Sequence, residues 1–126
     1  TPERAKFYQW LMFLTNTVQT EFLVYYYPDR YSTEVEDAPA IKDAAEKRLI
    51  EYFEIIEAQL GQKGPYMMGK ALSFLDFYLL MLCRWGRFLG AKPSDMPRLG
   101  KHVKLVSKHP SVVRSFEQEK LEAPYV

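Results

Sequence analysis

The stretch Ser73-Phe74-Leu75-Asp76-Phe77-Tyr78-Leu79-Leu80-Met81-Leu82-Cys83 determines the fold class of this chain. Ser73 followed three residues later by Asp76 has the spacing of a capping box, with Asp in place of the usual Glu or Gln. The residues that follow are apolar on nearly every side of a helix, which is typical of a helix buried on all faces. We therefore predict a buried central helix that begins at Ser73 and ends at Gly90.

The rest of the chain divides into four further helices at its proline, glycine and capping positions. Apolar residues recur every three to four positions on both sides of Ser73, whereas no segment alternates with a period of two. The predicted helices cover residues 3–27, 37–61, 73–90, 95–107 and a segment that begins at Pro110. We expect an all-α five-helix bundle around the Ser73 helix, in one domain over residues 1–126.

Composition excludes several classes of function. Of 126 residues, 48% are hydrophobic and 26% are charged, and the net charge of +1 gives no electrostatic argument for nucleic-acid binding. The longest uninterrupted apolar run, residues 77–83, is far shorter than the ~20 residues that a membrane span requires. Cys83 is the single cysteine, so neither an intramolecular disulfide nor a multi-cysteine metal site is possible. We expect no nucleic acid, membrane or metal partner.

The segment Gly64-Pro65-Tyr66-Met67-Met68-Gly69-Lys70-Ala71 nearly matches the phosphate-binding loop G-x-x-x-x-G-K-[ST]. Its last position is Ala71, which cannot bind magnesium, and the predicted preceding element is a helix instead of a strand. Its interior also holds bulky Tyr and Met side chains where backbone N–H groups would have to surround a phosphate. The pattern therefore favours an ordinary loop.

Other candidate residues have ordinary structural interpretations. His102 and His109 are seven positions apart, which favours surface or capping histidines over metal ligands. Cys83 lies deep in the apolar run, which favours a buried structural thiol. For Arg84 a salt bridge with Asp or Glu is the favoured interpretation, and an anionic ligand in a cavity is the alternative. No Ser/His/Asp or Cys/His set and no carboxylate pair is present, so we expect no catalytic residue in this chain.

The order of these features resembles the C-terminal helical domain of the cytosolic glutathione transferases. The resemblance extends from Glu3 to about Glu119 and includes the aromatic first helix, the charged second helix, Tyr66-Met67-Met68-Gly69 and His109-Pro110-Ser111-Val112. In that family a capping box and a hydrophobic staple begin the buried helix, and here Ser73 and Asp76 match the box. Leu72 and Phe77 match the staple, while Leu75 stands where the family commonly has Ala.

Within the family, Asp76-Phe77-Tyr78-Leu79 with Arg84-Trp85 further resembles the bacterial beta class. The resemblance implies a hydrophobic site for an electrophile, with Tyr78, Trp85 and Phe22 at matching wall positions. The beta class typically has a His where Gln19 stands here, and polar residues where Met12 and Thr17 stand. With the aromatic residues near them, the wall candidates are Trp10, Phe13, Phe22, Tyr78, Trp85 and Phe88.

The resemblance also implies what this chain lacks. The family binds glutathione mainly in an N-terminal thioredoxin-like domain that supplies the thiol-activating residue, and we expect that domain to be absent from these residues. Catalysis needs a thiolate held beside the electrophile, so we expect this chain alone to be inactive. The full protein is expected to be a cytoplasmic homodimer that conjugates glutathione to a hydrophobic electrophile in detoxification.

Two alternatives belong to other functional classes. Helical domains similar to those of glutathione transferases also act as non-catalytic interaction modules in translation factors and aminoacyl-tRNA synthetases. A stand-alone helical ligand binder would contain a closed cavity within one domain. The chain begins with Thr1, so the intact mass of the endogenous protein would separate these hypotheses.

Overall fold

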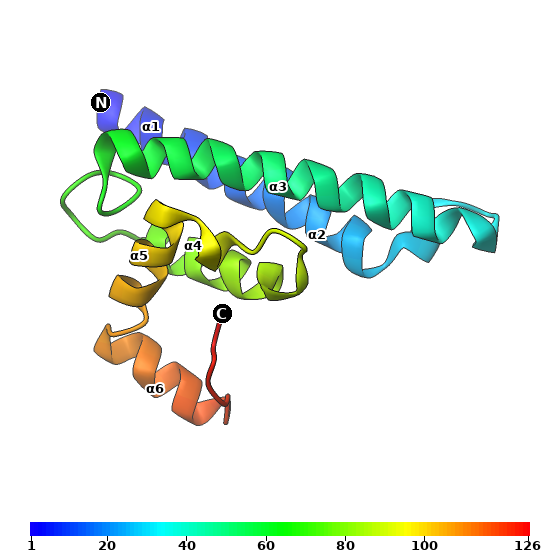
Figure 1. The fold of residues 1–126 in the computed structure, drawn as a ribbon. Helices are drawn as coiled ribbons and strands as arrows, with labels where there is room; N and C mark the ends of the chain where they lie inside the picture. The colour runs from blue at the N-terminus through cyan, green and yellow to red at the C-terminus, as the bar shows by residue number, and fades with distance from the viewer. The chain divides into compact units, whose positions relative to one another are not determined.

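A computed structural model describes all residues from Thr1 to Val126, and the chain folds into helices without a β-sheet (Figure 1). The predicted all-α fold class is therefore confirmed. The chain divides into two compact units, Thr1–Ile55 and Ile56–Val126, and we describe each by itself. Helix α3 (Ala38–Lys63) begins in the first unit and ends in the second.

In the first unit, α1 (Pro2–Met12), η1 (Phe13–Val18) and α2 (Gln19–Tyr26) form the one long helix that the sequence predicts. The beginning of α3 runs back along it (Figure 1), and Arg48 and Glu21 join the two helices through an ion pair of 2.7 Å. The short helices η2 (Pro28–Tyr31) and η3 (Val35–Asp37) make the connection. The unit's buried apolar side chains are Leu14, Val18, Phe22, Tyr25, Ala45, Leu49 and Phe53.

The middle of the long helix, η1, is π-helical, which the sequence analysis did not predict. The Thr15 hydroxyl donates a hydrogen bond to the Leu11 carbonyl at 2.9 Å. Such bonds from Thr side chains to the preceding turn compete with regular helix hydrogen bonds. The buried side of the helix is nevertheless regular across η1, since Leu14, Val18, Phe22 and Tyr25 recur every three to four positions.

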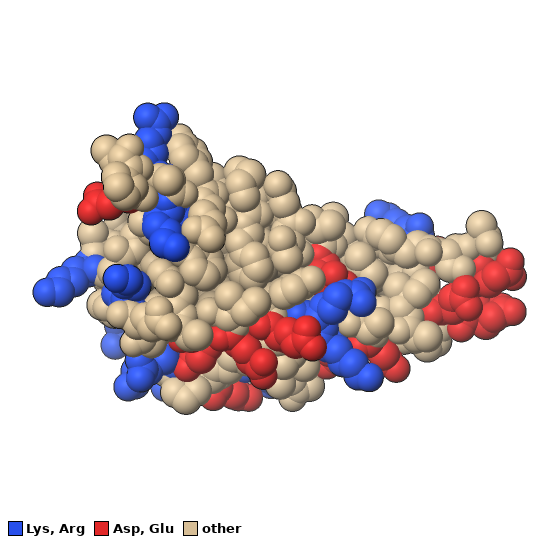
Figure 2. All heavy atoms as spheres, turned by 90° about the horizontal axis from the view of Figure 1, so that it is seen from above, with Lys and Arg blue, Asp and Glu red and all other residues tan.

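Charged side chains are unevenly distributed on the first unit. Figure 2 shows acidic side chains gathered at the end of the drawn face where α2 connects to α3. Glu36 and Asp37 of η3 belong to this connection. The Ser32 hydroxyl donates to the Asp37 carboxylate at 2.6 Å and so fixes the turn before α3.

In the second unit the loop after α3 leads into α4 (Phe74–Trp85), followed by η4 (Gly86–Phe88) and η5 (Pro93–Asp95). Helices α5 (Pro97–Val106) and α6 (Pro110–Gln118) complete the unit. As predicted, α4 is buried along most of its length. Its buried residues are Leu75, Asp76, Leu79, Leu80, Leu82 and Cys83.

The predicted end of the central helix at Gly90 is wrong, because α4 ends at Trp85. Gly86 follows directly, and a Cβ atom there would lie 2.8 Å from the ring of Pro93. Glycine therefore allows the chain to turn and pack Pro93 closely against the end of α4. Two other predicted boundaries shift by two residues, since α3 continues past Gly61 to Lys63 and α5 begins at Pro97 instead of Asp95.

Candidate functional site

Asp76 is fully buried at the start of α4 and joins three segments of the second unit. Its Oδ2 accepts hydrogen bonds from the Ser73 backbone N–H at 2.8 Å and from the Ser73 hydroxyl at 3.2 Å. Its Oδ1 accepts the Met67 N–H at 2.8 Å and lies 2.9 Å from His102 Nε2. Asp76 therefore fixes the preceding loop and α5 in addition to the N-terminus of its own helix.

The expectation of a surface or capping role is wrong for His102 and correct for His109. The side chain of His102 is completely buried against Asp76, because α5 packs this side of the helix on α4. His102 Nδ1 has no hydrogen-bond partner. By contrast, His109 caps α6, since its Nδ1 accepts the Ser111 N–H at 3.2 Å. Nothing in the spacing of the two histidines indicated this difference.

A cavity of about 620 Å³ lies between α4 and α6 in the second unit. This volume lies in the range of roughly 300–1,000 Å³ that is usual for small-molecule sites. Apolar side chains from both helices form most of its wall, and Arg84 and Glu119 add charged groups. The lining side chains include Phe77, Leu80, Met81, Trp85, Val112, Phe116 and Leu121.

The C-terminal segment crosses the region of this cavity. After α6 the chain reverses at Lys120, whose φ of 52° is in the left-handed region, and Leu121 N–H donates to the Phe116 carbonyl at 3.0 Å. The Tyr125 ring then stacks on Phe116 with 4.4 Å between ring centroids. The carbonyl of Tyr125 accepts a hydrogen bond of 2.6 Å from Arg84 Nη1.

This contact overturns the favoured interpretation of Arg84. The guanidinium forms no ion pair with an acidic side chain, and a backbone carbonyl is its acceptor. The nearest basic neighbour on the chain, Arg87, donates to the Arg84 carbonyl at 2.7 Å and lies over the Phe88 ring at 4.3 Å. Arg84 is thus a half-buried cation beside an apolar cavity.

The predicted wall residues divide between the two units. In the first unit, Trp10 and Phe13 meet edge to face at 5.7 Å, and Phe22 is completely buried against Phe53 at 6.0 Å. Trp10 Nε1 is buried without a hydrogen-bond partner. Their assignment to a substrate site stays a prediction.

In the second unit only Trp85 of the three candidates borders the large cavity. Tyr78 packs near Phe74 with 5.9 Å between ring centroids, and Phe88 is 65% exposed. Phe77, Met81 and Phe116 also line the cavity, although the sequence did not identify them as wall residues. Their i, i+4 spacing with Trp85 places Phe77 and Met81 on one side of α4, but a helix that is apolar all round does not indicate which side faces a cavity.

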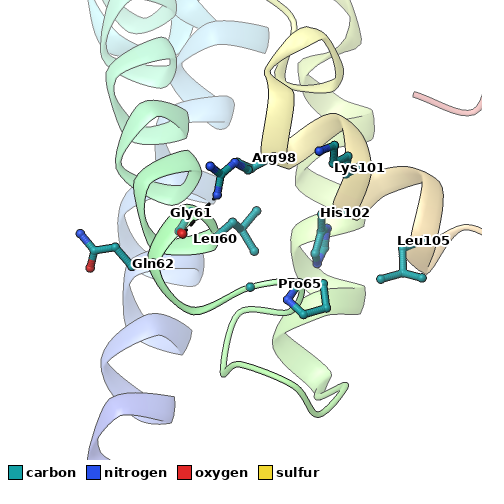
Figure 3. A pocket seen from close by; sticks show the side chains of 9 residues that line it. Leu60, Gly61, Gln62, Pro65, Arg98, Lys101, His102 and Leu105 are labelled. Carbon is teal, nitrogen blue, oxygen red and sulfur yellow. Dashed lines mark hydrogen bonds between the residues drawn. The ribbon is translucent and has the colours of Figure 1, made fainter.

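A smaller cavity of about 250 Å³ lies where the end of α3 approaches α5 (Figure 3). Arg98 projects into this region, and its Nη1 donates to the Gly61 carbonyl at 3.1 Å, as the dashed line in Figure 3 marks. The Arg98 guanidinium therefore satisfies a carbonyl at the C-terminal end of α3. The lining residues are Leu60, Gly61, Gln62, Gly64, Pro65, Arg98, Lys101, His102 and Leu105.

The loop that nearly matches a phosphate-binding motif is filled by its own side chain. Met67 is completely buried, and its carbonyl accepts a hydrogen bond from Gln59 Nε2 at 3.0 Å. Tyr66 and Gly69 exchange two backbone hydrogen bonds across the turn. These groups are therefore engaged within the protein instead of being directed at a phosphate.

Cys83 and Tyr78 of α4 are not activated as nucleophiles. Burial raises the pKa of the Cys83 thiol well above its ordinary value, so the thiol stays neutral. Burial also raises the pKa of the Tyr78 hydroxyl. No group of three or more His, Cys, Asp or Glu side chains is placed to hold a metal ion, and no helix combines the length and apolar character that a bilayer span requires.

Comparison with known proteins identifies the family. A family model described as the glutathione S-transferase C-terminal domain matches residues 16–119, so this chain belongs to that family. The fold is similar to that of a crystal structure of a glutathione S-transferase from Actinobacillus pleuropneumoniae, with a TM-score of 0.72 and 17% sequence identity. The match covers 99% of this chain and 54% of that one, so this chain spans about half its length. No curated protein matches the sequence.

Proposed function

We propose that this chain is the helical part of a glutathione transferase and that it binds the hydrophobic co-substrate. In this proposal, glutathione is held mainly by the remainder of the protein, and this chain supplies the apolar half of the active site. The chain contributes no thiol-activating residue. Membership of the glutathione S-transferase C-terminal family supports the general assignment.

The observation that carries the proposal is the cavity of about 620 Å³ between α4 and α6. Aromatic and aliphatic side chains give such a cavity affinity for an apolar molecule, because its surface leaves water on binding. Trp85 supports the proposal most directly, because it is a wall candidate from the family resemblance and also lines this cavity. Holding the electrophile in place would raise the reaction rate by removing the entropic cost of bringing two reactants together.

The test is glutathione conjugation by the full-length protein with a chlorodinitrobenzene as electrophile. We expect Trp85→Ala to raise KM for the electrophile about tenfold, while KM for glutathione stays within about twofold. Phe74→Ala is the control, because Phe74 is an exposed aromatic of the same helix that lies outside the cavity. Unchanged electrophile kinetics in Trp85→Ala would contradict the wall assignment.

We further propose that the protein forms a homodimer through the long helix of the first unit. Tyr8 and Met12 are 46% and 47% exposed at i, i+4 positions, and Leu23, Tyr26 and Tyr27 form a second exposed apolar group on α2 and at its end. Exposed apolar groups of this kind mark interaction surfaces. If the full-length protein had no affinity for glutathione and carried a different protein on this surface, the interaction-module hypothesis would replace the transferase hypothesis.

A further inference from the structure

Among the basic side chains of the second unit, Arg87 also donates to a backbone carbonyl, but Arg84 alone lines the large cavity. It is half-buried at the edge of an apolar cavity and takes part in no ion pair. An arginine that leaves water normally gains a carboxylate or phosphate partner, because its planar guanidinium forms strong paired hydrogen bonds with such groups. Here the acceptor is the neutral carbonyl of Tyr125 at 2.6 Å.

The C-terminal segment presents two chemical groups to this site. The Tyr125 ring stacks on Phe116, which lines the cavity, while the carbonyl of the same residue meets Arg84. An aromatic ring and an oxygen acceptor are therefore held next to an apolar space and a cation. These are the two contacts that a ligand with an aromatic ring and an oxygen acceptor would make.

We propose that the cavity between α4 and α6 binds an aromatic carboxylate, with the carboxylate on Arg84 in place of the Tyr125 carbonyl. The ring of this ligand packs among Phe77, Trp85 and Phe116. The inference rests on the proposed function, since it names the chemical class of the hydrophobic co-substrate. A carboxylate accepts paired hydrogen bonds from the planar guanidinium and carries a full negative charge, whereas the Tyr125 carbonyl is a neutral acceptor of a single bond.

Three other polar side chains of the cavity also affect its preference for a carboxylate. Glu119 lines the cavity and is exposed, so it opposes an anion through a repulsion that water and salt partly screen. Ser111 and Ser115 line the cavity too, and their hydroxyls are able to donate hydrogen bonds to a carboxylate. The charged side chains around the ligand are therefore Arg84, which attracts a carboxylate, and Glu119, which repels it.

Isothermal titration of the full-length protein with naphthoate, and with naphthamide as the neutral ligand of matched shape, tests the proposal. We expect naphthoate to bind about tenfold more tightly than naphthamide. Arg84→Met should abolish this preference, whereas Lys104→Met, which removes a positive charge from an exposed position outside the cavity, should preserve it. Arg84→Lys keeps the charge without the paired donors and should retain part of the preference.

Three further variants separate ligand selection from a loss of folding. Glu119→Gln removes the opposing carboxylate and should tighten naphthoate binding a few-fold at low salt. Tyr125→Ala removes the ring that stacks on Phe116 and should also tighten binding, because the ligand then competes with a weaker intramolecular contact. Tyr125→Phe keeps the ring and should bind like the wild type.

The outcomes distinguish this inference from the function on which it rests. Equal affinity for the two ligands, or a preference that survives Arg84→Met, would overturn the aromatic carboxylate. If the protein conjugates chlorodinitrobenzene normally but binds neither ligand, the inference fails and the proposed function stands. If naphthoate binds in an Arg84-dependent way without any conjugation, the ligand class is supported and the transferase function is contradicted.

Discussion

At the residue scale, Asp76 illustrates how one side chain combines a local and a tertiary role. Its carboxylate accepts hydrogen bonds from Ser73, one residue before α4, and from Met67, in the loop after α3. It also contacts His102 on α5. The bonds to Ser73 depend only on a spacing of three residues, while the other two require the folded unit.

Replacing Asp76 should therefore cost more than replacing an ordinary helix cap. We expect Asp76→Ala to lower the free energy of unfolding by about 3–5 kcal/mol, because buried donors and His102 lose their acceptor. Ser73→Ala should cost about 1 kcal/mol, as the loss of a capping side chain usually does. Urea unfolding followed by circular dichroism measures both, and equal losses would show that the buried contacts add nothing.

Cys83 should make stability depend on alkaline pH. The native pKa of the thiol is raised by burial, while the unfolded chain keeps its ordinary pKa of 9.0. The stabilisation is complete below pH 9 and is lost at higher pH, because only the unfolded state then releases the proton. The free energy of unfolding of the wild type, relative to Cys83→Ala, should fall by about 1.4 kcal/mol from pH 8 to pH 10. A constant difference over this range would show that the thiol ionises equally in both states.

At the element scale, α5 obtains its N-terminal cap from another helix. Met96, the residue before α5, has no side chain able to cap it. The Glu57 carboxylate of α3 instead accepts the Arg98 N–H at 2.7 Å and the Leu99 N–H at 2.8 Å. These are two of the amide groups that a helix cannot satisfy internally, and a negative charge at this end also favours the helix dipole.

Glu57→Ala should weaken the attachment of α5. We expect the free energy of unfolding to fall by about 1–2 kcal/mol and the exchange of the Arg98 and Leu99 amide hydrogens to accelerate. Glu54→Ala on the same helix is the control and should change stability by less than about 0.5 kcal/mol, because Glu54 is an exposed side chain outside this cap. NMR measures this exchange, and unchanged exchange of the Arg98 and Leu99 amides in Glu57→Ala would show that Glu57 does not cap α5.

At the scale of the whole molecule, the first unit carries an exposed apolar surface on its long helix. The π-helical segment η1 interrupts the α-helical hydrogen bonding of this helix, while its buried residues still recur every three to four positions. Tyr8 and Met12 lie before η1, and Leu23 and Tyr27 lie after it. An interface formed by Tyr8 and Met12 together with Leu23 and Tyr27 would therefore extend across the π-helical segment.

The homodimer proposal leads to a direct measurement. We expect the double variant Tyr8→Glu and Met12→Glu to shift the full-length protein from dimer to monomer at micromolar concentration, because it places charges in an apolar interface. Val35→Glu is the control, since Val35 is 80% exposed in the η3 connection. Light scattering after size-exclusion chromatography gives the mass of each form, and a dimer that survives the double substitution would place the interface elsewhere.

Local patterns in the sequence predicted the all-α class, the order of the helices and the burial of α4. Spacing of three to four residues and the Ser73 capping position act over short distances along the chain, so they can be recognised without a structure. The resemblance to the glutathione transferases followed from the order of these same elements. The end of α4 was misplaced, because the close packing of Pro93 on Gly86 depends on a residue seven positions away.

The sequence by itself thus determined which segments are helices and which family they belong to. Only the tertiary structure decided that His102 is buried on Asp76, that Glu57 caps α5 and that Arg84 meets the Tyr125 carbonyl. Each of these contacts joins residues at least 26 positions apart. Side chains so distant along the chain become neighbours only when helices pack, and no periodic pattern within one helix specifies its partner.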